Sequence, residues 1–414
     1  MNIRQEAYFI LRDIHLNENY ANLSMRGQLQ SFDVRDRSLI SQLVYGSLQN
    51  YRYVRALWSQ FVEGELEEEI GILLDMTTYQ LLFLDRLPAY AIINDAVEIS
   101  KRIQHGKYQK LVNAVSRKVQ EQSLDFTVTD EKDLALKTSH PDWLVQLWIA
   151  HYGYEFTKDF CFFNNTVRKS AVRVNTLKTT REELLKDSDF QAGKLASNSL
   201  YYEGNILESK YYQKQAIIIQ DEASQYIGEI VGSEKGERIL DACSAPGTKA
   251  IQLAITMENT GEVIALEPYE HRLQLIKNSI ELYDIKNMQT LQMDARFVTD
   301  SNLGEFDRVL VDAPCSGLGT LRHKPDIKLR IQPEDIDSLV VLQAEILKAA
   351  ASVVKENGIL VYATCTVNKK ENEKQIERFL KEHASFELIE ERQIDPLQYE
   401  TDGFYYAKMR RGQK

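Results

Sequence analysis

The sequence predicts an α/β protein with a largely parallel sheet in its carboxyl-terminal half, preceded by an all-helical region and a small α/β connecting segment. Apolar residues recur at helical spacing through the first part of the chain. Short apolar runs then alternate with helical stretches, the pattern of a parallel sheet covered on both faces. The chain has 414 residues, and since one core rarely exceeds ~250–300 residues, we expect several domains.

The first domain is predicted to span residues 1–130 and to be a helical bundle. Apolar side chains follow helical spacing there, for example Ile92, Ala96 and Ile99, and the few glycines and prolines lie between such segments. A change of pattern then marks a small connecting subdomain over 140–230. Residues 171–178 alternate as in a strand, and Ala216–Gln220 is a second strand candidate.

The third domain is predicted over residues 231–414. The expected parallel strands are Arg238–Asp241, Val263–Glu267, Met288–Met293, Arg308–Asp312 and Ile359–Ala363. Helices are expected between them, including His271–Tyr283 and Asp337–Lys355, and residues 386–391 and 404–409 predict two last strands at an antiparallel edge. Ligands of such sheets bind beyond the carboxyl ends of the strands.

Charge is unevenly distributed along the chain. With 61 acidic and 50 basic residues the net charge is −11, which taken alone argues against a nucleic-acid partner. However, residues 101–119 and 160–181 and the tail from 403 contain basic residues and no acid. Each run by itself is also explained as a solvated helix face. Together they favour a surface that meets an anionic polymer, with Lys107, Lys110, Arg117, Arg168 and Arg173 as candidate contacts.

Other patterns exclude several classes of protein. No apolar run reaches the ~18–20 residues of a membrane span, and the start of the chain lacks the features of a signal peptide. The four cysteines form no C-x-x-C pair, so the sequence supports neither a zinc ribbon nor thioredoxin-like chemistry. We therefore predict a cytoplasmic, monomeric protein that has no metal site and does not bind membranes.

A nucleoside site is predicted after the first two strands. The loop after Asp241 is built of small residues and resembles no phosphate-binding G-x-G-x-x-G turn. Its candidate binding residues are Cys243, Ser244, Ala245, Pro246, Gly247, Thr248 and Lys249. Glu267 closes the second strand, where an acid accepts hydrogen bonds from ribose hydroxyls. The two features together point to a nucleoside without a pyrophosphate, and S-adenosylmethionine fits that description.

Polar and sulfur-containing residues follow the next three strands. Asp294 is placed to accept from an adenine amine, although a helix N-cap is an equally good interpretation. Cys315 follows the fourth strand in Asp312-Ala-Pro-Cys-Ser-Gly, and Cys365 follows the fifth in Ala-Thr-Cys-Thr. A single cysteine is usually a small buried hydrophobic residue. Two cysteines that end adjacent strands are expected to face one crevice.

These motifs together resemble the RNA 5-methylcytosine methyltransferases. The resembling segments are DACSAPGTK, MDAR, DAPCSG and ATCT. Residues 35–50, 88–101 and 111–118 look like a NusB-type RNA-binding domain, and 173–178 and 220–224 look like the segments joining it to the catalytic part. This order is similar to that of the RsmB (Sun/Fmu) family, which methylates C5 of cytosine in 16S ribosomal RNA.

The resemblance implies a Rossmann-like class I methyltransferase domain with S-adenosylmethionine as its cofactor. It also implies that Cys365 is the nucleophile, that Cys315 assists product release, and that Asp312 lies between base and cofactor. Lys249 is expected either to orient Asp312 as an ion pair or simply to cap and solvate the loop. Spacing alone leaves the two cysteines interchangeable, because DNA cytosine methyltransferases use the Pro-Cys cysteine. The family usually has Gly or Ser at Thr248, and Asp at Glu267, so we expect altered cofactor contacts at these two positions.

The chemistry explains why a thiol is needed. A thiolate that adds to C6 of cytosine converts C5 into a carbon nucleophile that can attack a methyl sulfonium. The base must leave its stack, which favours a structured RNA loop as substrate. Residues 321–330 follow the Cys315 loop, and there Arg322 and Lys324 are expected to clamp neighbouring nucleotides. Two alternatives remain at this stage: the same reaction on tRNA, and a non-catalytic RNA-binding assembly factor.

Overall fold

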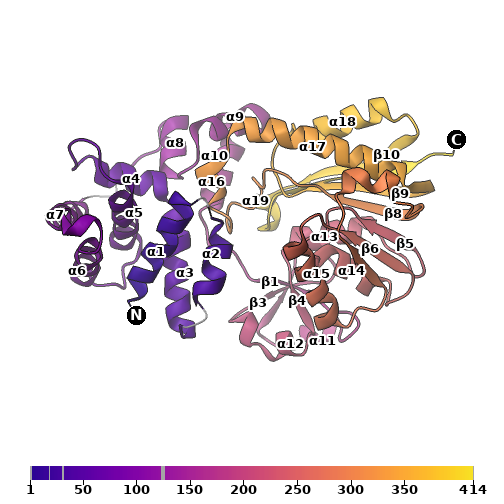
Figure 1. Ribbon diagram of the computed structural model, residues 1–414, viewed down its shortest axis with the longest axis horizontal. Coiled ribbons are helices and arrows are strands. Elements are labelled where there is room, and N and C mark those ends of the chain that lie inside the picture. The colour runs from indigo at the N-terminus through magenta and orange to yellow at the C-terminus, as the bar shows by residue number, and fades with distance from the viewer. Residues whose placement is uncertain (1, 18, 30–31, 123–125, 414) are drawn as a thin grey trace. The chain divides into compact units, whose positions relative to one another are not determined.

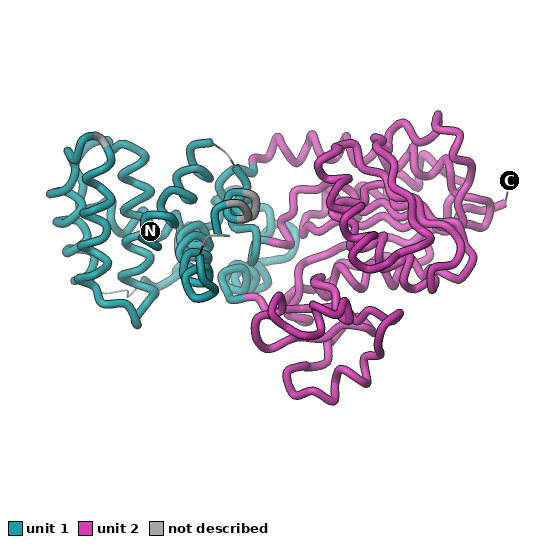
Figure 2. The backbone as a smooth tube through the Cα atoms, turned by 60° about the horizontal axis from the view of Figure 1, so that its bottom comes forward, with its two compact units in different colours: residues 1–167, 321–331 teal, residues 168–320, 332–414 magenta. Residues whose placement is uncertain are grey.

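The computed structural model describes residues 2–17, 19–29, 32–122 and 126–413, and the chain divides into two compact units. The first, the helical unit, contains residues 1–167 and 321–331 (Figure 2). The second, the sheet unit, contains residues 168–320 and 332–414. None of the helices in the described ranges combines the length and apolar character needed to span a bilayer.

The helical unit contains the helical region predicted at residues 1–130, and it also includes residues 140–167, which the sequence assigned to the connecting subdomain. Its helices are α1 (Ile3–Leu16), α2 (Ala21–Gln28), α3 (Val34–Gln49), α4 (Tyr51–Ser59), α5 (Glu68–Phe83), α6 (Ala89–Ser100), α7 (Gln109–Gln120), α8 (Glu131–Lys137), α9 (Asp142–Tyr152) and α10 (Tyr154–Phe163), with the 3-10 turn η2 (Gln104–Gly106) before α7. Leu43, Leu73 and Val112 are fully buried and belong to one core that joins α3, α5 and α7. Asp33 and Asp130 cap helices α3 and α8 by accepting from backbone N–H groups, which explains where these helices begin.

Residues 321–331 pack with the helical unit although they follow the Cys315 loop in sequence. They contain the short helix α16 (Ile327–Arg330). Lys328 is 1% exposed, and its ammonium donates to the carbonyl oxygens of Gln49 and Thr138 and to Oδ1 of Asn165, at 3.0, 3.2 and 2.9 Å. A buried ammonium needs such acceptors, so Lys328 anchors this segment among the helices.

The sheet unit begins with a four-stranded antiparallel sheet of order β2-β3-β1-β4. The predicted strands around 171–178 and 216–220 are present as β1 (Ala171–Val174) and β4 (Ile217–Ile219). The sequence did not predict β2 (Phe190–Ala192) and β3 (Ser199–Tyr202), which are only three and four residues long and carry little periodicity. Its short helices are α11 (Arg181–Leu184), η3 (Ile206–Glu208) and α12 (Lys210–Gln213).

The second sheet has seven strands in the order β10-β11-β9-β8-β5-β6-β7. Its strands are β5 (Arg238–Asp241), β6 (Glu262–Leu266), β7 (Met288–Leu291), β8 (Phe306–Asp312), β9 (Val354–Thr364), β10 (Phe386–Ile394) and β11 (Phe404–Arg411). Strands β5 to β9 pair in parallel, while β11 pairs antiparallel with both β9 and β10. The predicted parallel sheet and its antiparallel edge are therefore confirmed.

Helices cover both faces of this sheet (Figure 1). Helices α13 (Glu222–Val231), α14 (Thr248–Thr256) and α15 (Glu270–Tyr283) cover one face, and α17 (Pro333–Ser352) and α18 (Glu373–Glu382) cover the other. Successive strand residues belong to opposite cores: Ile239 packs with the first layer and Leu240 with the second. The turns η4 (Ala295–Asp300) and α19 (Pro396–Tyr399) complete the unit.

Candidate active site

Two cysteine thiols meet at the carboxyl ends of β8 and β9. These strands pair in parallel, with Asp312 opposite Ala363, so the segments that follow them leave the sheet side by side. Sγ of Cys315 lies 3.4 Å from Sγ of Cys365. Neither thiol is in a disulfide and both are partly buried; their separation is that of a hydrogen bond, far above the ~2.05 Å of a disulfide. The structure thus brings together the two cysteines that the sequence singles out.

A glycine pair fixes the loop that follows Cys315. The N–H of Gly319 donates to the carbonyl oxygen of Cys365 at 3.0 Å, and the N–H of Gly403 donates to the carbonyl oxygen of Gly319 at 2.8 Å. A Cβ atom at Gly319 would lie 1.9 Å from the Gly403 oxygen. Only glycine therefore fits at Gly319, and the close approach ties the Cys315 loop to the Cys365 backbone.

The two thiols have different electrostatic surroundings. Nζ of Lys249 lies 2.7 Å from Oδ2 of Asp312, and the lysine side chain is 8% exposed. Burial alone would lower the pKa of Lys249, but the charge and hydrogen bond of Asp312, and then Cys365, raise it. In contrast, the hydrogen bond to Cys365, burial, the charge of Cys365 and then that of the Glu371 carboxylate raise the pKa of Cys315 well above that of a free thiol. A cation thus favours charge at Cys365, and an anion opposes it at Cys315.

The predicted nucleoside loop lies at the ends of β5 and β6. Ser244 N–H donates to the carbonyl oxygen of Leu266 at 3.0 Å, which fastens the loop to the end of β6. Gly247 has a φ of +101° and caps α14, and a Cβ atom there would approach Ile276 at 3.2 Å. The loop therefore presents its backbone at the start of a helix, an arrangement that suits close approach of a ligand.

The two acids predicted to hold the nucleoside each pair with a nearby arginine. Glu267 is 2% exposed; its Oε1 accepts from the N–H of Tyr269 at 3.1 Å, and its Oε2 pairs with Arg272 at 3.4 Å. Asp294 caps η4 by accepting from the N–H of Arg296 at 3.0 Å and also pairs with that guanidinium at 2.7 Å, which lowers the pKa of Asp294. The N-cap interpretation of Asp294 is therefore correct for this structure, and its contact with adenine stays a prediction.

Sequence reasoning missed two buried acids of this site. Asp241 ends β5 and is fully buried, and burial followed by the charge of Asp312 raises its pKa to about 7. Glu371 is also fully buried and lies behind Cys315. A polar run, Asn-Lys-Lys-Glu-Asn, directly follows the Cys365 segment at 368–372. Polar residues directly after a strand that ends in a candidate catalytic cysteine were the signal in the sequence that could have indicated Glu371.

The candidate RNA contacts fall into two groups. Lys107, Lys110 and Arg117 are exposed residues of the helical unit, and Lys324 is exposed in the segment that packs with it. Arg322 belongs to the same segment, and its guanidinium donates to the carbonyl oxygen of Val167 at 2.9 Å. Their contact with RNA stays a prediction.

The prediction for Arg173 needs correction. Arg173 is 3% exposed, and its Nη1 donates to the Thr248 carbonyl oxygen and to Oε1 of Gln252, each at 3.0 Å. Alternation along β1 places this side chain inward, where it links the strand to α14. Arg168, at the start of the same unit, is partly buried and pairs with Asp221 at 3.6 Å. We therefore no longer expect Arg173 to contact phosphate.

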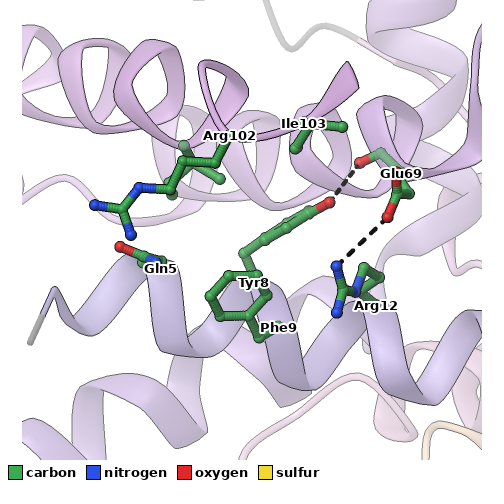
Figure 3. Close-up of a pocket in the computed structure, with 8 residues that line it drawn as sticks. Gln5, Tyr8, Phe9, Arg12, Glu69, Arg102 and Ile103 are labelled. Carbon is green, nitrogen blue, oxygen red and sulfur yellow. Dashed lines mark hydrogen bonds and ion pairs between the residues drawn. The ribbon is translucent and has the colours of Figure 1, made fainter. Parts of the chain in front are cut away.

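A small cavity of about 120 Å³ lies in the helical unit (Figure 3). It is lined by Gln5, Tyr8, Phe9, Arg12, Glu69, Ile99, Arg102 and Ile103. The Tyr8 hydroxyl donates to the Glu69 carbonyl oxygen at 3.3 Å, and Arg12 pairs with the Glu69 carboxylate at 3.4 Å. The polar groups of Tyr8, Arg12 and Glu69 are therefore paired with one another, and the residues that line the cavity include no thiol. The chemistry of the protein is therefore expected at the cysteine pair.

Comparison with known proteins gives consistent results over the whole chain. Residues 229–410 match the family model "16S rRNA methyltransferase RsmB/F", residues 1–121 match the NusB family, and residues 140–206 match the RsmF/B-like ferredoxin-like domain. The chain is 34% identical to the probable ribosomal RNA small subunit methyltransferase B of Bacillus subtilis, over 99% of this chain and 98% of that protein.

Two further relatives extend the likeness. Ribosomal RNA small subunit methyltransferase B of Vibrio vulnificus is 30% identical over 98% of this chain and 99% of its own length. The crystal structure of PH0851 superposes with a TM-score of 0.84 at 25% identity, covering 98% of both chains. The helical unit, the ferredoxin-like sheet and the seven-stranded sheet thus all have counterparts in one group of proteins.

Proposed function

The chain belongs to the RsmB/F family of 16S rRNA methyltransferases, and we propose that it methylates C5 of one cytosine in 16S rRNA through a covalent bond between Cys365 and C6. The observation that carries this proposal is the pair of thiols, neither of them in a disulfide, that lie 3.4 Å apart at the ends of β8 and β9, with the charge of Lys249 acting on Cys365. A non-catalytic assembly factor would not need this arrangement.

Bond formation begins at Cys365. Its thiolate adds to C6 of the extruded cytosine, and the C5–C6 electron pair becomes available at C5. S-adenosylmethionine, when bound, supplies an electrophilic methyl group that C5 attacks. The ammonium of Lys249 favours the thiolate before attack, because it places positive charge near Cys365 in a partly buried site. Asp312 pairs with Lys249 at 2.7 Å, and we expect its carboxylate to stabilise the activated ring by accepting a hydrogen bond from a protonated N3.

Product release requires two bonds to break. A base removes the proton from C5, the electrons of that bond restore the C5–C6 double bond, and the C6–sulfur bond breaks. The electron pair of the broken bond stays on the sulfur of Cys365. Cys315 lies at hydrogen-bonding distance from that sulfur, so it is placed to stabilise or protonate the departing thiolate. This geometry supports the role in product release that the family resemblance assigns to Cys315.

The residues at the ends of β5, β6 and β7 fit the nucleoside part of S-adenosylmethionine. The loop from Cys243 to Lys249 brings its backbone to the sheet edge at the start of α14, and Glu267 is a buried carboxylate at the end of β6. Such a carboxylate can accept from ribose hydroxyls. Asp294 would accept a hydrogen bond from the adenine amine while it also pairs with Arg296.

Substitution of Glu267 tests this cofactor site. We expect Glu267→Ala to weaken binding of S-adenosylmethionine about ten- to hundredfold, because a buried hydrogen-bond partner contributes ~1–3 kcal/mol. Asp294→Ala should weaken binding similarly. Isothermal titration calorimetry measures both, and Glu270→Ala is a matched control, since Glu270 is exposed and pairs with Lys277. Unchanged affinity in Glu267→Ala would show that the ribose contact is placed wrongly.

The function itself is tested by mapping 5-methylcytosine across total RNA of cells with and without the protein. We expect one cytosine of 16S rRNA to lose its methyl group when the protein is absent, and to regain it when the wild-type chain is supplied again. Loss of the mark from tRNA, with 16S rRNA unchanged, would contradict the proposal and favour the tRNA alternative.

A further inference from the structure

Glu371 is a fully buried carboxylate that accepts hydrogen bonds from four donors. Its Oε1 accepts from the N–H of Ser316 at 2.9 Å and from Nε2 of Gln343 at 3.0 Å. Its Oε2 accepts from Oγ of Ser316 at 2.5 Å and from Nδ2 of Asn368 at 2.9 Å. Four donors match the acceptor capacity of an ionised carboxylate. Two of them belong to the residue that directly follows Cys315.

The same group of residues also holds the segment that carries Cys365. Oγ of Ser316 lies 2.7 Å from Oγ1 of Thr366, so the residues following the two cysteines contact each other. The Tyr362 hydroxyl, on β9, donates to the backbone oxygen of Glu371 at 2.8 Å. Nε2 of Gln343, on α17, donates in addition to the carbonyl oxygen of Pro314 at 2.9 Å. Glu371 thus lies where both cysteine segments and α17 meet.

We propose that Glu371 is a positioning residue that decides which of the two thiols is the nucleophile. It holds Cys315 against Cys365 through Ser316, and its negative charge keeps Cys315 a neutral thiol beside the thiolate of Cys365. The inference deepens the proposed function and rests on it for its catalytic consequence. Glu371 acts on the reaction through the Cys315 loop and not by contact with the substrate.

The charges around the thiols support this division of roles. Glu371 is one of the groups that raise the pKa of Cys315, after the hydrogen bond to Cys365, burial and the charge of Cys365. The charges of Lys249 and Cys365, in contrast, stabilise each other. Without Glu371, one of the charges that raise the pKa of Cys315 would be absent, so the two thiols would differ less in their tendency to ionise. The fixed anion therefore distinguishes two thiols that lie at the ends of neighbouring strands.

A neutral Cys315 has a defined use in the reaction. When the C6–sulfur bond breaks, the Cys315 thiol donates a hydrogen bond to the departing sulfur of Cys365 and keeps its own proton, because the thiolate is favoured at Cys365 and disfavoured at Cys315. The base that took the C5 proton releases it to solvent. One proton is released for each methyl group transferred, and both sulfurs return to their starting states, Cys365 as the thiolate and Cys315 as the thiol.

Alkylation of the free protein tests the inference. Wild-type enzyme, with neither RNA nor cofactor, is treated with iodoacetamide between pH 6 and pH 9, and each cysteine is followed by mass spectrometry. We expect Cys365 to react before Cys315 throughout this range. In Glu371→Gln, which keeps the shape of the side chain and removes its charge, Cys315 should react about tenfold faster at a fixed pH. Faster reaction of Cys315 than Cys365 in the wild type would overturn the inference without any variant.

Two controls separate charge from packing. Gln343→Leu removes one hydrogen-bond donor from Glu371 and leaves its charge, so alkylation of Cys315 should stay slow. If Gln343→Leu accelerated alkylation of Cys315 as much as Glu371→Gln does, loosened packing would be the cause and the proposal would be overturned. Asp337→Asn removes an exposed acid that pairs with Lys370, and it should leave the reactivity of both thiols unchanged. Thermal unfolding of each variant verifies that it is folded.

These outcomes are distinct from those that test the proposed function. The alkylation profile is measured without a substrate, so it holds or fails whichever RNA is methylated. Cytosine methylation in cells could be absent while the thiols still show this order of reactivity. Conversely, a chain that methylates 16S rRNA but shows no effect of Glu371→Gln on Cys315 would keep the proposed function and lose this inference.

Discussion

Replacement of Cys365 by alanine is expected to abolish methyl transfer to 16S rRNA while cofactor binding is unchanged. The thiolate acts only on the base, and without a bond at C6 the C5 atom of cytosine is too weak a nucleophile to attack the methyl group. Loss of a covalent nucleophile typically costs on the order of 10⁴-fold or more in rate. Transfer of labelled methyl groups to unmodified 16S rRNA measures the rate, and calorimetry with S-adenosylmethionine measures binding.

The matched control is Cys161→Ala. Cys161 is a buried cysteine of α10 in the helical unit, and burial raises its pKa to about 12, as for an inert thiol in an apolar core. This variant removes a thiol and should retain methyl transfer. Turnover by Cys365→Ala at a rate near that of the control would exclude Cys365 as the nucleophile.

Much of the fold could be predicted because apolar periodicity is strong in the long elements. The predicted strand Arg238–Asp241 matches β5, and the predicted helix at 271–283 differs from α15 by one residue. Strand β9 is longer than predicted, since it begins at Val354, in a segment whose burial alternates poorly. The short strands β2 and β3 were missed because three or four residues carry too little pattern to be recognised.

Long-range packing explains what the sequence could not show. The sequence predicts that residues 321–330 clamp nucleotides beside the active site, whereas Lys328 is held by backbone oxygens of Gln49 and Thr138, more than a hundred residues away in the chain. Likewise the basic pattern around Arg173 indicated a surface, but strand alternation turns this side chain inward. A charge pattern shows which charged residues a segment contains, but the fold decides which of their side chains are exposed.

The sequence predicted which residues form the candidate site, but not which charges act on the two thiols. Spacing placed Cys315 and Cys365 at the ends of neighbouring strands, and the pairing of β8 with β9 brings them together. Their roles were assigned by family resemblance alone. The structure adds a physical asymmetry that spacing does not contain, because Lys249 and Glu371 act on opposite members of the pair. Glu371 was missed because a buried acid cannot be distinguished from an exposed one in a single sequence.

The second large effect is expected for Cys315→Ala, which should accumulate a covalent adduct between protein and RNA. Attack by Cys365 does not require Cys315, so the C6 bond forms and the methyl group is transferred. Release is then slow, because no thiol lies 3.4 Å from the departing sulfur to stabilise or protonate it. A denaturing gel with labelled 16S rRNA fragments and S-adenosylmethionine should show a band of reduced mobility that the wild type shows only weakly.

The double variant Cys315→Ala/Cys365→Ala establishes which bond the gel detects. It should give no adduct, because neither thiol remains to attack C6, and Cys365→Ala alone should also give none. An adduct in Cys365→Ala together with its absence in Cys315→Ala would reverse the two roles and match the DNA-type assignment. That reversal would also require Glu371 to lie beside the attacking thiolate, where its charge opposes the ionised form. The electrostatics of the site therefore favour attack by Cys365 and release assisted by Cys315, and the gel decides between the two assignments.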